Sequence, residues 1–574
     1  MKLLYKHKPF IAMVVAILLF YPTLFFAQAN DDYASKQKDV DAFFNALYNK
    51  DTGGLAIALV KNGEVVFSNA YGMANLEYDI PNTVNTVFHA ASLSKQFTAY
   101  AILLLVIDGK IALTDDVRTY IPEVPDFGTK ITLHQLASHT SGLRDQWRLL
   151  HLAGWRMDDV ILNSDILKLV SQQTDLNFEP GSQVKYSNTG FTLLAEVVSR
   201  VSGKSFAEFT QERIFTPLKM TNSQFYDDYE KVVKNRAYSY KKEGGNIKKH
   251  KLSFSTVGAT SLFTTVMDLS KWAIHLNTLN DRNPELATLM NTPAKLNNGE
   301  VTEAAMGQWT DVKFKGMEWF DHSGSDASFR AYFSRFPESN SAVVYLGNTV
   351  PKEGGASDYA LAVADVYLKE YYKESKENDT KEEDRSHEEN FKPITLSNEE
   401  LQAFCGKYWE TEELYNREIK LIEGQLVYYR RESSQTKLLP VGKNEFKMLD
   451  DPNDVSVFFE KNEAGLSAMR LNINNERTVN FIKYSPESDP KKYLGTYYSP
   501  EVDNTIRITL NDENKIEAIL GKHDVAELQQ VQGPLFKSSD RNLQKIEFTE
   551  NNTENVTGLK ITNGGAVNVK FQKQ

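Results

Sequence analysis

Cysteine is almost absent from this sequence, which has one among 574 residues. Cys405 has no partner within the chain, which excludes an internal disulfide and any cysteine-rich zinc or iron–sulfur centre. The ten histidines lack a ligand spacing paired with carboxylates, so the sequence predicts no metal and no cofactor. Positive charge is also in the minority, with 65 Lys+Arg against 76 Asp+Glu and a net charge of −11. An acidic chain without a long Lys/Arg run is a poor candidate for binding nucleic acid.

Long apolar runs are absent except near the N-terminus, at residues 10–26. Three lysines precede this run, and the small residues Ala27 and Ala29 follow it. This order is typical of a signal peptide, so residues 1–29 are predicted to be cleaved and the protein exported, to a periplasmic or extracellular location. An uncleaved membrane anchor is the alternative, because the run is close to the shortest length that spans a bilayer. No cysteine follows the run, which excludes a lipoprotein anchor.

Residues 30–373 are predicted to form one α+β domain, in which an antiparallel sheet flanked by helices combines strands from both ends. Asn62-Gly63, between two segments of alternating polarity, is a strong hairpin signal. Strands are predicted at residues 55–60, 64–70, 329–336 and 342–347, and helices at 40–48, 92–107 and 357–372. The charged segment that follows, residues 374–391, is predicted to be a solvated linker.

The C-terminal part of the sequence contains an internal repeat. Gly406 and Gly495 lie 89 residues apart, and four pairs of apolar residues lie 90 apart. A near-constant offset at five places indicates duplication. Each copy divides into about eight short strands, so residues 392–486 and 487–574 are each predicted to form an all-β barrel. One sixteen-stranded sheet folded on itself is the alternative.

Ser92 and Lys95 are the first residues that indicate chemistry, because they open a long apolar helix. Residues three apart on a helix share a face, so the Lys95 amine can reach the Ser92 hydroxyl. A partly desolvated amine there accepts the serine proton and makes a nucleophile. At a helix start, the backbone amide of Ser92 also suits an oxyanion hole. The same Ser-x-x-Lys spacing occurs at five other places, where chance is the simpler explanation because none of them opens a long apolar helix.

Tyr186 and Asn188 form a second candidate group, on a loop between the turn at residues 179–181 and a helix that begins after Gly190. A phenol beside an ammonium has its ionised form favoured, which makes Tyr186 a candidate general base next to Lys95. Asn188 is a candidate hydrogen-bond partner of the lysine and of a substrate amide. A turn tyrosine with a capping asparagine is the alternative.

His322, Ser323, Gly324 and Ser325 form the third group, beside a predicted strand. Small residues there let a substrate backbone lie close and pair with the strand edge. The Ser325 amide is the candidate second oxyanion donor, and His322 is a candidate to orient or protonate the leaving side of the substrate. A structural histidine near a strand end is the alternative. His139 is a further candidate as a triad histidine for the nucleophile, but no acid is assigned to orient it.

The ordered set Ser-x-x-Lys, Tyr-x-Asn and His-x-Gly resembles the serine penicillin-recognising superfamily of β-lactamases, penicillin-binding proteins, D-aminopeptidases and related esterases. Residues 133–143, 214–220 and 258–272 are similar to that superfamily in type and order, and the resemblance covers about residues 34–373. It implies a β-lactamase/transpeptidase-like fold, with the acylation proton shared between lysine and tyrosine in a way that the sequence leaves open. By position it implies Ser92 as nucleophile, Lys95 and Tyr186 as bases, Asn188, His322 and Gly324 as substrate contacts, and the Ser92 and Ser325 amides as oxyanion donors.

One departure concerns the third motif, where β-lactamases of this group usually have Lys-Thr-Gly. His322 is largely neutral at pH 7, which weakens a carboxylate site and is more like the D-aminopeptidase and esterase branch. The resemblance therefore implies a serine hydrolase that forms an acyl-enzyme with a small ester or a short peptide containing D-amino acids. The barrels are expected to wall the cleft or to contact cell-envelope material. A carboxylesterase, a weak β-lactamase and a penicillin-binding envelope sensor without turnover are the alternatives.

Overall fold

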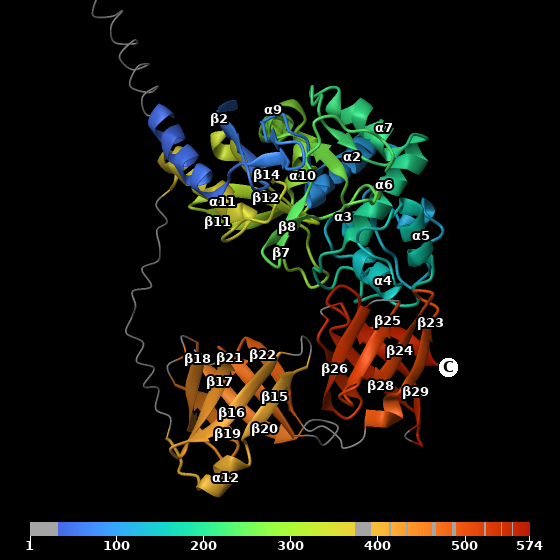
Figure 1. Ribbon diagram of the computed structural model, residues 1–574, viewed down its shortest axis with the longest axis vertical. Helices are drawn as coiled ribbons and strands as arrows, with labels where there is room; N and C mark the ends of the chain where they lie inside the picture. Colours follow the sequence, from blue (N-terminus) through green and yellow to red (C-terminus); the bar gives the residue numbers. More distant parts are fainter. Residues whose placement is uncertain are drawn as a thin grey trace, which may run out of the picture.

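The computed structural model describes residues 33–373 and 392–574, apart from residues 412–414, 432–433, 450, 452, 462–466, 485–489, 522–523, 541 and 554. It shows an N-terminal α+β domain followed by two β-barrels (Figure 1). The predicted signal peptide and charged linker lie outside the described residues. Within the part of the chain that the structure describes, no helix is long and apolar enough to cross a membrane.

The N-terminal domain is built on a seven-stranded antiparallel sheet in the order β10-β11-β12-β13-β14-β1-β2. Its strands are β1 (Leu55–Lys61), β2 (Glu64–Tyr71), β10 (Ala304–Ala305), β11 (Gln308–Phe314), β12 (Met317–Asp326), β13 (Phe329–Phe336) and β14 (Ser341–Gly347). β14 pairs with β1, so the sheet joins the two ends of the domain, as the sequence predicts. Asn62 and Gly63 have φ angles of 53° and 79°, the left-handed conformation that a tight hairpin turn requires.

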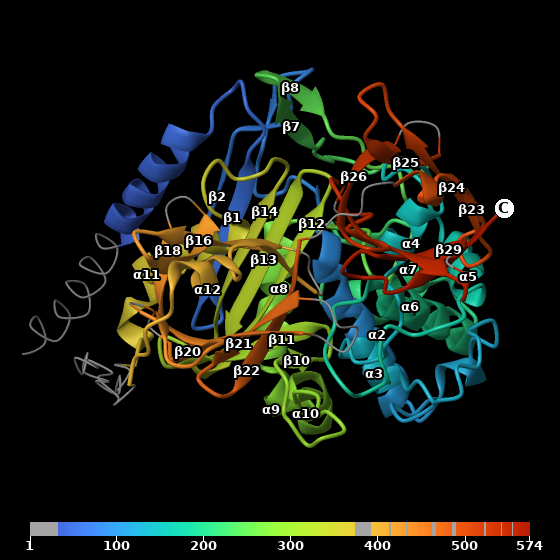
Figure 2. The ribbon, with the colours of Figure 1, turned by 90° about the horizontal axis from the view of Figure 1, so that it is seen from below.

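Helices cover both faces of this sheet, which buries β1 along its whole length (Figure 2). Because side chains alternate along a strand, Ala56 and Ala58 pack in one core and Leu55 and Ile57 in another. The helix of residues 33–47 and α11 (Ala356–Leu368) contribute to the second core. The remaining helices are α2 (Ser94–Ile107), α3 (Leu133–Ala137), α4 (Gln146–Leu152), α5 (Asn163–Ser171), α6 (Asn188–Ser202), α7 (Phe206–Thr210), α8 (Val266–Asn277), α9 (Leu279–Arg282) and α10 (Pro284–Asn291).

The repeat folds as two separate closed barrels of eight antiparallel strands each, so the alternative of one sixteen-stranded sheet is wrong. Each closes when its last strand pairs with its first. Barrel 1 comprises β15 (Gly406–Glu410), β16 (Asn416–Ile422), β17 (Gln425–Arg431), β18 (Ser434–Pro440), β19 (Glu445–Met448), β20 (Val455–Lys461), β21 (Ser467–Ile473) and β22 (Arg477–Lys483). Barrel 2 comprises β23 (Gly495–Ser499), β24 (Asn504–Leu510), β25 (Ile516–Leu520), β26 (Asp524–Gln532), β27 (Leu535–Ser538), β28 (Lys545–Glu550), β29 (Val556–Thr562) and β30 (Val569–Lys573).

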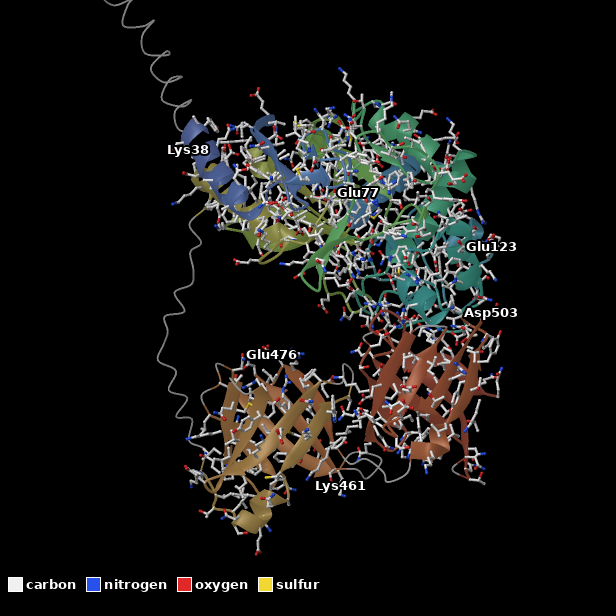
Figure 3. The ribbon with its side chains drawn as sticks, in the orientation of Figure 1. Lys38, Glu77, Glu123, Lys461, Glu476 and Asp503 are labelled. Carbon is white, nitrogen blue, oxygen red and sulfur yellow. The ribbon has the colours of Figure 1, made fainter. Side chains whose placement is uncertain are left out.

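Barrel 2 docks on the N-terminal domain beside α4, at a junction where Asp503 is labelled (Figure 3). The side chain of Arg144 is fully buried there and forms an ion pair with the buried carboxylate of Glu501, which comes from barrel 2. The backbone amide of Asp145 donates a hydrogen bond to the carbonyl of Gly565 at 2.8 Å. One contiguous cluster of buried side chains runs from the helices of the N-terminal domain into the barrel. Barrel 2 is therefore packed against the rest of the protein through buried polar and apolar contacts.

Candidate active site

The predicted nucleophile lies in a tight turn rather than in the first turn of an α-helix. Ala91–Leu93 form a 3-10 turn, and α2 begins at Ser94, two residues later than predicted. Ala91 has a φ of 50°, an uncommon conformation for a residue with a side chain. The Ser94 hydroxyl donates to the Ala91 carbonyl at 2.6 Å and accepts from the Leu262 amide at 3.0 Å, which fixes the turn. The half-buried Ser92 side chain is thereby held at the start of α2.

Lys95 lies completely buried beneath Ser92. Its Nζ donates to Ser92 Oγ at 3.0 Å, to Asn188 Oδ1 at 2.8 Å and to the Ala259 carbonyl at 2.8 Å. Burial lowers the pKa of this amine to about 7, and the negative charges of two nearby aspartates oppose the shift only in part. A large share of the molecules therefore carries a neutral amine at neutral pH, which is the form that can accept a proton from Ser92.

Tyr186 is the second residue that contacts Ser92. Its hydroxyl donates to Ser92 Oγ at 2.7 Å, and its ring lies 4.9 Å from the Lys95 Nζ. Burial raises the pKa of the Tyr186 phenol well above its ordinary value, although the hydrogen bond to Ser92 opposes the shift. The sequence predicts the reverse, because it considers only the neighbouring ammonium and not the cost of placing a phenolate in this environment. The structure favours a neutral phenol that donates a proton.

Asn188 connects the lysine to an aspartate that the sequence analysis does not identify. Asn188 is the first residue of α6, and its Oδ1 accepts from Lys95. The Asp145 carboxylate accepts from the Asn188 side-chain amide at 2.7 Å and from its backbone amide at 2.8 Å. Because Asp145 also donates its own amide to Gly565, a continuous series of hydrogen bonds runs from barrel 2 to Ser92. No motif in the sequence indicates this role for Asp145, since only the fold brings it to α6.

His322 lies on β12 and is almost completely buried. Its Nδ1 lies 2.6 Å from the Ser323 carbonyl, which assigns the proton to Nδ1 and leaves Nε2 as an acceptor. Nε2 is buried without a hydrogen-bond partner among the described residues. Burial and the nearby charge of Lys95 lower the pKa of His322 to about 3. The imidazole is therefore neutral at pH 7, so the predicted alternative in which it protonates a leaving group does not fit this environment.

Gly324 serves the fold rather than the approach of a substrate. A Cβ at this position would lie 2.4 Å from the Ala90 carbonyl oxygen and 3.3 Å from the Ala91 Cβ. Only glycine allows β12 to lie against the turn that carries the nucleophile. On the β11 side, β12 pairs only as far as Asp321, so the edge that includes Ser325 is open to an extended ligand.

His139 supports the site as a structural residue. Its Nδ1 accepts from the Ser187 amide at 3.1 Å, and its ring lies 4.4 Å from that of Tyr186. Burial lowers the pKa of His139 well below its ordinary value. Since Ser92 Oγ is contacted by Lys95 and Tyr186, the triad alternative has no support in this geometry. Among the described residues, no group of three or more His, Cys, Asp and Glu side chains gathers as a metal site.

The predicted site residues meet around one cavity of about 340 Å³. Two of the predicted residues do not line it. Lys95 is completely buried behind the cavity wall, and Gly324 packs against the turn that carries the nucleophile. The residues that line the cavity are Ser92, Trp147, Tyr186, Asn188, Thr260, Trp309, His322, Ser323, Ser325 and Asp326. A serine hydroxyl that contacts a lysine amine and a tyrosine hydroxyl, and that opens to a cavity, is the arrangement of a serine hydrolase.

Comparisons with known proteins agree with this class. The family model described as Beta-lactamase matches residues 39–368, more than half of the chain, and the protein belongs to that family. Penicillin-binding protein 4* of Bacillus subtilis is 26% identical over 330 residues, which are 55% of this chain and 72% of that protein. A D-aminopeptidase of Brucella anthropi is 26% identical over 322 residues, 56% of this chain and 60% of that enzyme.

Solved structures with a similar fold match between 58% and 78% of the chain. The solved structure of an octameric penicillin-binding protein homologue from Pyrococcus abyssi matches with a TM-score of 0.51 and 22% identity, over 78% of this chain and 99% of that one. A penicillin-binding protein from Bacillus halodurans matches with a TM-score of 0.50 and 25% identity, over 58% and 99%. These similarities support the β-lactamase/transpeptidase-like fold of the N-terminal domain.

Proposed function

We propose that the protein is an exported serine hydrolase that forms an acyl-enzyme on Ser92 and cleaves amide or ester bonds of small or D-amino-acid-containing peptides. The observation that carries the proposal is the pair of hydrogen bonds to Ser92 Oγ, from Lys95 at 3.0 Å and from Tyr186 at 2.7 Å. The similarity to a D-aminopeptidase supports the peptide substrate. Export rests on the sequence of residues 1–29.

The positions of the two proton-handling groups assign them different roles. The neutral Lys95 amine accepts the proton as Ser92 Oγ attacks the carbonyl carbon, and the backbone amides of Ser92 and Ser325 hold the oxyanion. Lys95 does not line the cavity, so it cannot reach a leaving group directly. Tyr186 does line it and gives its proton to the departing nitrogen or oxygen, and the proton held by Lys95 then passes to the resulting phenolate, which lies with Lys95 beside Ser92 Oγ. Water then releases the acyl group by the reverse sequence.

The neutral charge of His322 distinguishes a peptidase or an esterase from a β-lactamase. A β-lactamase site benefits from a positive charge that holds the carboxylate of the drug, and His322 supplies none at neutral pH. This favours a peptidase or an esterase over a β-lactamase.

A stopped-flow experiment with p-nitrophenyl acetate tests the proposal. We expect a burst of nitrophenol stoichiometric with enzyme, followed by turnover, and an acetyl group on the peptide that contains Ser92 by mass spectrometry. Hydrolysis of D-alanine p-nitroanilide in preference to the L-isomer would then support the D-peptide substrate. Acetylation without turnover would favour the sensor, and the absence of both burst and acetyl group would reject the hydrolase.

The pH dependence of acylation provides a second test. The protonated Lys95 amine cannot accept the serine proton, and its pKa is lowered to about 7. We therefore expect kcat/KM for a neutral ester to rise with pH, with an apparent pKa near 7, and to level off above pH 8. A profile that is flat or falls between pH 6 and 8 would contradict the assignment of Lys95 as the base.

A further inference from the structure

A second, larger cavity of about 1040 Å³ opens directly beside the catalytic one. The two cavities share five lining residues, so they adjoin, and a ligand bound at Ser92 can extend toward the larger one. The shared residues are Trp147, Tyr186, Asn188, Ser325 and Asp326. The wall on the far side is formed by the hairpin of β7 (Tyr240–Glu243) and β8 (Asn246–Lys249), together with the segment that follows it.

The larger cavity is basic in an otherwise acidic protein. Seven Lys and Arg side chains line it against four Asp and Glu, an excess of three positive charges where the chain as a whole carries −11. The carboxylates are already engaged, since Asp326 lies 2.9 Å from His89 Nε2 and Asp158 accepts from Arg156 at 2.8 Å. Glu243 likewise accepts from Lys248 at 2.6 Å. The acidic side chains therefore leave part of the positive charge uncompensated.

Three of the cations have no carboxylate within ion-pair distance in the described part of the chain, and they come from three different elements. Arg148 lies on α4, where its Nη1 donates to Asn542 Oδ1 at 2.6 Å. Lys251 follows β8 and is exposed. Arg330 lies on β13, where it is paired in register with Ser325. These side chains converge on the cavity from separate directions, as residues that recognise a charged group do.

Arg330 is the most informative of the three. It is half-buried, and its Nη1 donates only to the backbone carbonyls of Ala327 and Phe329, at 3.2 and 2.7 Å. Burial lowers the pKa of this guanidinium below its ordinary value. The charge of Asp326 opposes this shift only in part and without a direct ion pair, so an anion in the cavity would further stabilise the partly desolvated guanidinium. Its place opposite Ser325 puts it next to the proposed oxyanion site.

We infer that this basic cavity binds an anionic group of the substrate, a carboxylate or a phosphate, and that the protein therefore prefers acidic acyl compounds over neutral ones. The inference rests on the proposed function and specifies its substrate class. Because His322 contributes no charge at the reacting end, the selectivity for an anion arises in the neighbouring cavity. The charge can lie on the acyl side or on the leaving-group side of the scissile bond, and the experiment separates the two.

Matched pairs of esters test the inference. The first pair is mono-p-nitrophenyl glutarate against p-nitrophenyl glutaramate, with the charge on the acyl side and the spontaneous hydrolysis of each ester subtracted. The second is 3-carboxyphenyl acetate against 3-carbamoylphenyl acetate, with 3-acetoxyphenyl phosphate as the phosphate arm. At low ionic strength we expect the anionic member of at least one pair to have a kcat/KM about tenfold higher, mainly through KM. About 0.5 M salt should remove most of this preference, because the cavity is open to solvent.

Two variants show which side chains produce the preference for anionic esters. Lys251→Gln should lower the anionic preference several-fold, and Arg330→Gln should remove most of what remains. Lys242→Gln is the matched control, because Lys242 is exposed on the same hairpin but does not line the cavity. Equal kcat/KM within every pair, with the neutral esters still hydrolysed, would overturn the inference and leave the hydrolase intact. Failure to hydrolyse any of the esters would reject the proposed function and this inference with it.

Discussion

Replacement of Lys95 by methionine is expected to lower kcat/KM for p-nitrophenyl acetate by about 10²- to 10⁴-fold, the range for loss of a positioned proton acceptor. Among the residues that the structure describes, the lysine is the one group that contacts Ser92 and whose lowered pKa, about 7, suits it to accept a proton at neutral pH. Tyr186 is a poor replacement, because desolvation of its phenol raises the pKa well above the ordinary value even though 37% of the residue is exposed. Methionine fills nearly the same volume without a proton-accepting group. Initial rates and burst amplitudes measure the effect.

The free energy of unfolding of this variant should not be lower than that of the wild type. A completely buried amine is costly to desolvate, so its removal offsets the loss of hydrogen bonds to Asn188 and Ala259. Lys110→Met, which changes an exposed lysine beyond the end of α2, should leave activity unchanged. Ser92→Ala and the double variant with Lys95→Met should reach the same low rate, because residues that act as a unit are not additive. Substantial activity in Lys95→Met would contradict the mechanism.

The sequence predicts the site well where the chemistry depends on local spacing. Ser92 and Lys95 lie three residues apart at the start of a long apolar helix, and the spacing together with that position indicates their contact. The hairpin at Asn62-Gly63 and the pairing of β14 with β1 also follow from short patterns. The repeat with an offset of about 90 residues predicts two barrels, because each copy has about eight short strands, which is enough to close a small barrel.

The properties that depend on the environment were harder to predict. The sequence cannot show that burial outweighs the neighbouring ammonium at Tyr186, or that His322 is enclosed and neutral. Gly324 matches the expected motif, but the reason for the glycine is the close approach of Ala90, which lies 234 residues earlier in the chain. Burial and close approach arise only when distant segments pack together, so the residues identify the site but not its electrostatics.

Asp145 shows the limit of motif reasoning most clearly. It lies 43 residues before Asn188 and holds that side chain toward Lys95, yet nothing in its neighbourhood indicates such a role. Its backbone amide is bound by Gly565 of barrel 2, and the preceding Arg144 is paired with Glu501. Barrel 2 therefore supports the residues that orient the lysine. Its Gly565 also lines the larger cavity, so barrel 2 forms part of the wall that the sequence analysis expects.

Substitution of Glu501 by glutamine should therefore weaken both stability and catalysis. Arg144 and Glu501 have exposed side-chain fractions of 0% and 2%, so the variant leaves a buried guanidinium without its counter-ion. Breaking one partner of such a pair typically costs about 3–5 kcal/mol. We expect the first thermal transition to fall by several degrees and kcat to decline below that transition, because looser docking of barrel 2 lets Asp145 move away from Asn188.

A second ion pair across the same junction provides the control. Lys570 and Asp175 lie 2.6 Å apart with exposed side-chain fractions of 53% and 46%, so Asp175→Asn should cost at most about 1 kcal/mol and leave kcat unchanged. Calorimetry and steady-state rates on the two variants separate a buried structural contact from a solvated one. If Glu501→Gln behaves like Asp175→Asn in both measurements, the buried pair does not hold barrel 2 to the active site. A loss of kcat in Glu501→Gln alone, at a temperature where both variants are folded, would instead establish that a barrel more than 300 residues from Lys95 in sequence keeps the catalytic amine in place.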